Sequence, residues 1–220
     1  MTDTKRIMCF GDSLTWGWVP TLAGAPTTRY PFGERWTGVM AAALGEGYEV
    51  LEEGLSARTT NLDDPNDPRL NGSNHLPAAL ASHFPLDLVV VMLGTNDTKA
   101  VFRRTPFEIA NGLSKLLVQI LTSAGGVGTV YAAPKVLVIC PPPLAEMPHE
   151  WFQGMFDGGR EKTLAMPRQY QALCSFFGIE MLDAGQIMST NGCDGIHFTA
   201  EDNAVLGAAV ATRVSAMLSS

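Results

Sequence analysis

Short apolar runs alternate along the chain with longer segments of helical character. Apolar side chains fill nearly every position of Leu86–Leu93, which is typical of a parallel strand covered on both faces. Four further short runs are also rich in β-forming residues and predict strands: Arg6–Phe10, Tyr48–Leu51, Val136–Cys140 and Ile179–Leu182. We therefore expect five strands.

Three segments between or after these runs predict helices: Arg35–Leu44, Phe107–Thr122 and Thr199–Leu218. Thr105 is the expected N-cap of the second helix, and Thr199 that of the third. An order of strand, helix and strand predicts right-handed crossovers. The sequence therefore predicts an α/β fold, in which helices cover both faces of one parallel sheet.

Two long stretches show no regular pattern. Leu55–Asn74 is rich in Asp, Asn, Pro and Arg, and Pro141–Gly159 is rich in Pro, Trp, Phe and Met. Long irregular segments in compact domains are usually functional or disordered. We interpret the second, aromatic stretch as a lid, a pocket wall or a subunit contact. Because no linker or internal repeat divides the chain, we expect one domain over residues 1–220.

The composition is that of an ordinary globular protein, with 220 residues, 46% hydrophobic and 17% charged. Acidic residues outnumber basic ones 22 to 15, so nucleic acid and anionic membranes are poor candidate partners. No apolar run approaches the ~20 residues of a membrane span, and the first residues lack the apolar region of a signal peptide. The four scattered cysteines form no Cys-x-x-Cys pair. We therefore expect reduced thiols in a cytoplasmic protein.

Residues whose side chains are capable of catalysis or ligand binding follow four of the predicted strands. These blocks are Gly11–Leu14, Gly54–Arg58, Gly94–Asp97 and Asp194–His197. Ligands of open parallel sheets bind beyond the carboxyl ends of the strands, so all four blocks should face one site. Together they supply a hydroxyl, backbone amides, a carboxamide, and a carboxylate close to an imidazole.

This set matches the needs of acyl transfer. A serine hydroxyl becomes a good nucleophile when a neighbouring base takes its proton, and His197 could serve Ser13 in this way. Asp194 lies three residues before the histidine and could orient it. The candidate donors to an oxyanion are the Ser13 amide, a backbone amide near Ala57 and the Asn96 side chain.

Other readings of these residues stay open. Each block alone could be a turn or a helix cap. A metallophosphoesterase could use Asp12, Asn96, Asp97 and His197 as ligands, although two-metal sites usually have more histidine and carboxylate ligands. A non-enzymatic, flavodoxin-like binding module is a third reading. The intact Ser, Asn, Asp and His favour the esterase, for which we expect no metal and no cofactor.

The blocks Phe10–Leu14, Gly94–Asp97 and Asp194–His197 resemble those of the SGNH (GDSL) hydrolase family in order and spacing. The resemblance covers the whole chain. It implies a three-layer α/β/α sandwich of flavodoxin-like type around a five-stranded parallel sheet. The roles it implies are those of a nucleophile and oxyanion donor for Ser13, an oxyanion donor for Asn96, and the rest of the triad for Asp194 and His197.

The second block departs from the family pattern. The family usually has a glycine as the backbone oxyanion donor there, whereas Ala57 occupies the matching position. An alanine keeps the N–H group but tolerates a positive φ poorly. We therefore expect Ala57 to be a donor in a constrained conformation.

Longer segments are similar to the mycobacterial arylesterase/acyltransferase branch of the family: Gly11–Trp18, Glu53–Thr60, Asp67–Gly72 and Phe102–Pro106. This resemblance implies hydrolysis of short-chain and aryl esters, acyl transfer to alcohols or hydrogen peroxide in water, and a homo-octamer. The main alternative is an esterase for another acyl substrate, namely an acetylated sugar, a lysophospholipid or a thioester.

An apolar entrance would favour an alcohol over water as the acyl acceptor, because only the alcohol gains from burying apolar surface. The aromatic side chains near the blocks are candidates for such an entrance. The isolated histidines His75, His83 and His149 should be solvated or structural. The expected substrate-binding residues are Asp12, Trp18, Thr95, Trp151, Phe152, Phe156 and Ile196.

Overall fold

A computed structural model describes residues 4–219, and its centre is a five-stranded, wholly parallel sheet. The strand order is β2-β1-β3-β4-β5, which is the flavodoxin-like order. The predicted α/β fold is thus confirmed. The strands are β1 (Lys5–Gly11), β2 (Tyr48–Gly54), β3 (Leu88–Met92), β4 (Lys135–Cys140) and β5 (Glu180–Asp183).

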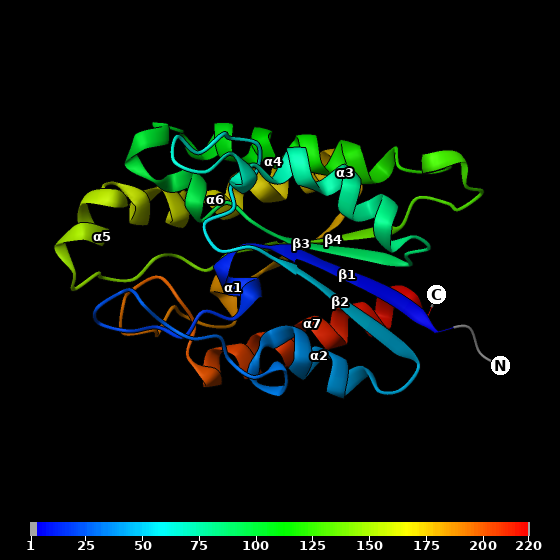
Figure 1. Cartoon of the computed structure of the whole chain (residues 1–220), viewed down its shortest axis with the longest axis horizontal. Coiled ribbons are helices and arrows are strands. Elements are labelled where there is room, and N and C mark those ends of the chain that lie inside the picture. The colour runs from blue at the N-terminus through cyan, green and yellow to red at the C-terminus, as the bar shows by residue number, and fades with distance from the viewer. Residues whose placement is uncertain (1–3, 220) are drawn as a thin grey trace.

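Helices cover both faces of this sheet (Figure 1). One face carries α2 (Trp36–Leu44) and α7 (Ala200–Leu218). The other face carries α3 (Gly72–His83), α4 (Pro106–Leu121) and α6 (Gly159–Phe177). The result is the expected three-layer α/β/α sandwich.

The central strand β3 shows why its sequence is continuously apolar. All five of its side chains are buried. Successive side chains of a strand point to opposite faces. Val89 and Val91 accordingly pack in the core beneath α3, α4 and α6, whereas Leu88, Val90 and Met92 pack in the core beneath α2 and α7. A strand that contributes to two cores has no position left for a polar side chain.

The sequence pattern did not predict α3 or α6, and each of them contains a proline, Pro77 or Pro167. A proline cannot donate to the carbonyl four residues before it. For Pro77 that carbonyl belongs to Ser73, and the Gln119 side chain of α4 donates to it at 2.8 Å. A contact between two helices therefore replaces the missing bond, and local sequence does not reveal such a contact.

Two short helices lie at the carboxyl end of the sheet (Figure 1). They are α1 (Ser13–Trp16) and α5 (Glu150–Met155). The stretch Pro141–Gly159 is thus irregular only in part, which corrects the prediction of one long loop. Single 3-10 turns occupy Phe32–Glu34, Pro68–Leu70, Asn96–Thr98, Ala100–Phe102, Gly126–Gly128 and Ala184–Gln186.

The four cysteines are free thiols, as expected from their scattered positions. Three of them are buried and Cys193 is exposed. Within residues 4–219, none of the helices combines the length and the apolar character that crossing a membrane would require.

Candidate active site

Ser13 is placed by a tight turn from β1 into α1. Asp12 caps this helix, because its Oδ1 accepts a hydrogen bond from the Leu14 amide at 2.9 Å. The helix lies directly against the end of β2 at Gly54, where an added Cβ would come within 2.4 Å of the Trp16 nitrogen. A glycine is needed for this close approach. The turn therefore holds Ser13 at the carboxyl edge of the sheet.

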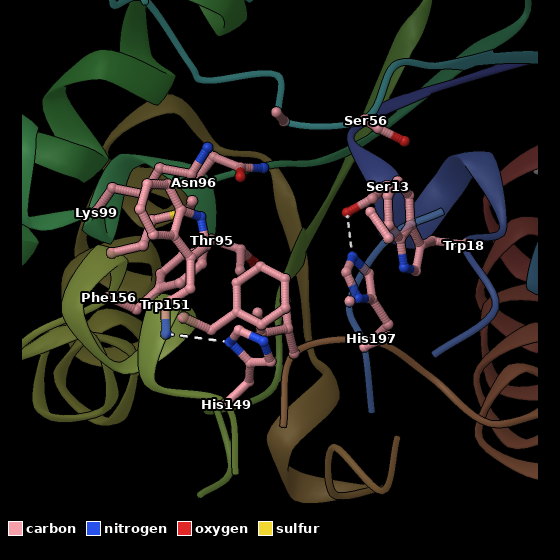
Figure 2. A pocket seen from close by; sticks show the side chains of 17 residues that line it. Ser13, Trp18, Ser56, Thr95, Asn96, Lys99, His149, Trp151, Phe156 and His197 are labelled. Carbon is pink, nitrogen blue, oxygen red and sulfur yellow. Dashed lines mark hydrogen bonds between the residues drawn. The ribbon is translucent and has the colours of Figure 1, made fainter. Parts of the chain in front are cut away.

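His197 and Asp194 lie on the loop that leads into α7, and they meet Ser13 in one hydrogen-bonded series. Figure 2 shows the bond between Ser13 and His197. His197 Nε2 is 2.9 Å from Ser13 Oγ, and His197 Nδ1 is 2.7 Å from Asp194 Oδ2. The second carboxylate oxygen, Oδ1, accepts from the Ile196 and His197 amides at 3.0 and 2.9 Å. One carboxylate thus fixes both the loop and the imidazole.

The environment of Asp194 favours its ionised form. Burial alone would raise the pKa of this carboxyl group, but the hydrogen bonds and charge of His197 outweigh it, and the pKa lies below its ordinary value. An ionised carboxylate beside Nδ1 stabilises an imidazolium. The pair can therefore accept a proton from Ser13 and hold it.

Ala57 has the positive φ that we expected to be unfavourable for an alanine. Its φ is +69°, in the left-handed region. It is the third residue of a turn that the Arg58 amide closes on the Leu55 carbonyl at 3.1 Å, a position that favours glycine when φ is positive. Such a conformation costs an alanine about 1–2 kcal/mol. The turn that carries the proposed oxyanion donor is therefore strained.

Asn96 connects three of the blocks. It begins the 3-10 turn after β3 and is buried. Its Nδ2 donates to Asp12 Oδ2 at 3.2 Å and to the Arg58 carbonyl at 3.1 Å. The amide is thus held beside the turns that follow β1 and β2.

Asp12 differs from our expectation. We predicted a substrate contact, but the side chain is fully buried and does not line the cavity above Ser13. Its two oxygens are engaged by Leu14 and Asn96. Burial, helped by the charge of Asp97, raises its pKa to about 7, against the Leu14 hydrogen bond and two nearby cations. Asp12 therefore positions other groups.

A cavity of about 290 Å³ opens above Ser13 and His197 (Figure 2). Its wall is largely apolar and aromatic. The Trp18 ring stacks on the His197 imidazole, with 5.1 Å between centroids and 18° between planes. The cavity can therefore hold an apolar ester group against Ser13. The predicted substrate-binding residues that line it are Trp18, Thr95, Trp151, Phe152, Phe156 and Ile196.

Several residues of this wall were not predicted. His149, expected to be solvated or structural, lines the cavity and also caps α5, because its Nδ1 accepts from the Trp151 amide at 3.1 Å. The only available signal was its place in the aromatic stretch. The other lining residues that the sequence analysis missed are Ala23, Gly24, Ala25, Ser56, Lys99 and Met155.

Asp97, a possible metal ligand in one alternative, is engaged elsewhere. Its carboxylate accepts from the Thr60 hydroxyl and amide. Burial raises its pKa to about 6, although these hydrogen bonds oppose the shift. Over the part of the chain that the structure describes, no three His, Cys, Asp or Glu side chains gather as metal ligands.

Comparison with known proteins decides the family. The sequence profile of the GDSL-like lipase/acylhydrolase family matches residues 9–205, a span that includes all four blocks. The chain belongs to the GDSL-like lipase/acylhydrolase family. The resemblance to SGNH (GDSL) hydrolases is thus confirmed, and ester hydrolysis is the activity that membership of this family supports.

Two solved structures are similar over 97% of this chain and 100% of their own chains, each with a TM-score of 0.96. They are the aryl esterase of M. smegmatis, at 63% identity, and a carbohydrate acetylesterase from Sinorhizobium meliloti, at 62%. An acetylxylan esterase from Xylanibacter ruminicola is 28% identical over 212 residues, which are 89% of this chain and 40% of that protein. The chain thus spans less than half of the length of the acetylxylan esterase.

The raised pKa of Asp12 predicts a pH effect on the stability of this GDSL hydrolase. An unfolded chain releases the Asp12 proton near pH 4, but the folded protein holds it to about pH 7. The folded state binds more protons between these values, so the free energy of unfolding falls as the pH rises. Asp12→Asn should make this fall smaller, as measured by urea unfolding from pH 5 to pH 8.

The control for this experiment is Asp67→Asn. Asp67 is not buried, and its hydrogen bonds with Arg69 lower its pKa to about 2, so it titrates outside the window. This variant should keep the wild-type slope, part of which comes from Asp97. Equal slopes in wild type and Asp12→Asn would contradict the proposed ionisation of Asp12.

Proposed function

We propose that the protein is a serine esterase that hydrolyses short-chain and aryl carboxylic esters through an acyl-enzyme on Ser13. The single observation that carries this proposal is the hydrogen-bonded series from Asp194 through His197 to Ser13, which ends in an apolar cavity. The cavity accounts for the preference for apolar and aryl esters, because its aromatic wall gains from burying apolar surface.

In the acylation step, Ser13 Oγ attacks the ester carbonyl carbon while its proton moves to His197 Nε2, 2.9 Å away. The carbonyl oxygen becomes an oxyanion. When this intermediate collapses, the bond to the alcohol part breaks, and His197 gives its proton to the departing oxygen. The acyl group is then bound to Ser13, and Asp194 has stabilised the imidazolium throughout.

The proposed oxyanion donors are the backbone amides of Ser13 and Ala57 and the side chain of Asn96. Ser13 is the first residue of α1, and the first N–H groups of a helix have no intrahelical acceptor. The two hydrogens of Asn96 Nδ2 are directed at Asp12 and Arg58. Donation by Asn96 thus requires that one of them, such as the longer 3.2 Å bond to Asp12, be shared with the oxyanion.

Deacylation repeats these steps with a second acceptor. Water yields the acid, an alcohol yields a new ester, and hydrogen peroxide yields a peracid; in each case His197 takes the acceptor's proton and returns it to Ser13. Burial of an alcohol's apolar surface contributes about 25 cal/mol per Å². Water gains nothing comparable. The apolar wall therefore supports acyl transfer to alcohols, with perhydrolysis as a related outcome.

Ser13→Ala should abolish release of 4-nitrophenol from 4-nitrophenyl acetate, because no acyl-enzyme can form. The wild type should also convert part of the acyl group to a new ester when a primary alcohol is added to aqueous buffer. Chromatography of the products measures this partition. Ser56→Ala is the control, because Ser56 lines the same cavity but is not part of the hydrogen-bonded series from Asp194 to Ser13. Equal rates in wild type and Ser13→Ala would overturn the proposal.

Trp18→Ala should lower the ratio of transfer to hydrolysis. The indole lies on the imidazole face at the entrance, where it restricts water and offers apolar contact to an alcohol. Removing a large aromatic side chain gives up about 2–3 kcal/mol of such contact at most, so we expect a severalfold change in the ratio. A ratio equal to that of the wild type would argue against this role for Trp18.

A second candidate substrate is an acetylated sugar. The relatives at 62% and 28% identity are described as a carbohydrate acetylesterase and an acetylxylan esterase. The same catalytic series would serve such an ester. The apolar wall favours aryl and short-chain esters over sugars, and comparison of acetylated sugars with aryl acetates in one assay decides between the two.

We also propose that the chain forms a homo-octamer. Large apolar side chains are exposed on several elements, and subunit contacts would cover some of them. Sedimentation should then give a mass of eight chains, and a monomer at micromolar concentration would contradict this assembly. The most exposed of these side chains are Val130, Val127, Phe176, Trp151, Phe107 and Leu22.

A cytoplasmic location is our proposal as well. Its support is that Cys9, Cys140, Cys174 and Cys193 are all free thiols, a state that reducing compartments maintain.

A further inference from the structure

Lys99 occupies an unusual position in the cavity wall. It follows Asn96 by three residues and lies on the same side of the cavity as Asn96, Thr95 and Phe156, across from His197 (Figure 2). The residue is only 8% exposed. Among the described residues that line the cavity, it is the only Lys, Arg, Asp or Glu.

The ammonium group of Lys99 has no hydrogen-bond or ion-pair partner within residues 4–219. Lys162 is a useful contrast, because its Nζ donates to the Thr98 carbonyl at 3.0 Å. Most of the residue is buried, but Lys99 Nζ is not one of the fully buried side-chain atoms that lack a partner, so the ammonium is accessible from the cavity. Burial of the residue lowers the pKa of Lys99, and the charges of Asp64, Asp12 and Asp97 oppose this shift.

Phe156 holds this ammonium at the wall. Lys99 Nζ lies 5.9 Å from the centroid of the Phe156 ring, within the range of a cation–π contact. Phe156 is itself buried and packs with Leu144, Met147 and Ile196. The contact leaves the three N–H donors of the ammonium available to a ligand in the cavity.

We propose that Lys99 binds a carboxylate of the substrate, so that the site prefers esters that carry an anionic group near the scissile bond. This inference rests on the proposed esterase function. A carboxylate accepts charge-assisted hydrogen bonds, which are about twice as strong as neutral ones. No arginine and no second lysine is among the described residues that line the cavity. The carboxylate can belong to the acyl part or to the alcohol part of the ester.

The test uses two pairs of esters, each with a charged member and a neutral one of similar shape. For the acyl part, these are the 4-nitrophenyl monoester of glutaric acid and 4-nitrophenyl 5-methylhexanoate. For the alcohol part, they are 4-carboxyphenyl acetate and 4-isopropylphenyl acetate. The readout is the ratio of kcat/KM for the charged ester to kcat/KM for the neutral ester.

Lys99→Met should lower this ratio about tenfold in at least one pair, as expected for loss of a charge-assisted hydrogen bond. The pair that responds identifies which part of the ester carries the carboxylate. Lys115→Met, which removes the same charge from an exposed position on α4, should leave both ratios at the wild-type value. Lys99→Gln, which is polar and uncharged, should behave as Lys99→Met and serves if the methionine variant does not fold.

The inference would be overturned if, in both pairs of esters, the ratio is the same in the wild type and in the Lys99 variants. That outcome is distinct from failure of the proposed function. If the wild type hydrolyses neither member of either pair, or if Ser13→Ala is equally active on them, the esterase proposal fails and the inference fails with it.

Discussion

The parallel pairing of β1 between β2 and β3 is the constraint on which the site depends. Parallel strands end at the same edge of the sheet, so the turns after β1, β2 and β3 meet there. The Asn96 amide joins them, with bonds of 3.2 Å to Asp12 and 3.1 Å to the Arg58 carbonyl. Because two apolar cores hold the strands in register, the sheet determines where Ser13 lies relative to Asn96.

Buried charge is the second feature that shapes the site. For Asp194, the hydrogen bonds and charge of His197 and two backbone amides offset the cost of burying the carboxylate, and its pKa is lowered. For Asp12 and Asp97, the hydrogen bonds and nearby cations do not outweigh burial, which raises their pKa values to about 7 and about 6. Within residues 4–219, the Lys99 ammonium has no hydrogen-bond or ion-pair partner and lies over the Phe156 ring. Charges held in this way destabilise a fold and are typical of sites that bind or react with ligands.

The wall of the cavity above Ser13 is formed largely by segments outside the sheet. Trp18 follows α1, while His149, Trp151 and Phe156 belong to α5 and its flanks (Figure 2). These elements pack above the nucleophile without contributing to the sheet. In the proposed esterase, catalytic geometry and substrate selection therefore depend on different parts of the molecule.

The sequence by itself determined the strands, the α/β order and the four blocks, because apolar periodicity and turn chemistry are local properties. The family resemblance indicated the conflict at Ala57, because the family usually has a glycine at this position, and the φ of Ala57 is positive. Only the tertiary structure decided the rest. The helix around Pro77 depends on Gln119 from another helix, Asp12 turned out to be buried, and Lys99 became a lining residue. Each of these outcomes depends on contacts between residues distant in sequence, which no local pattern encodes.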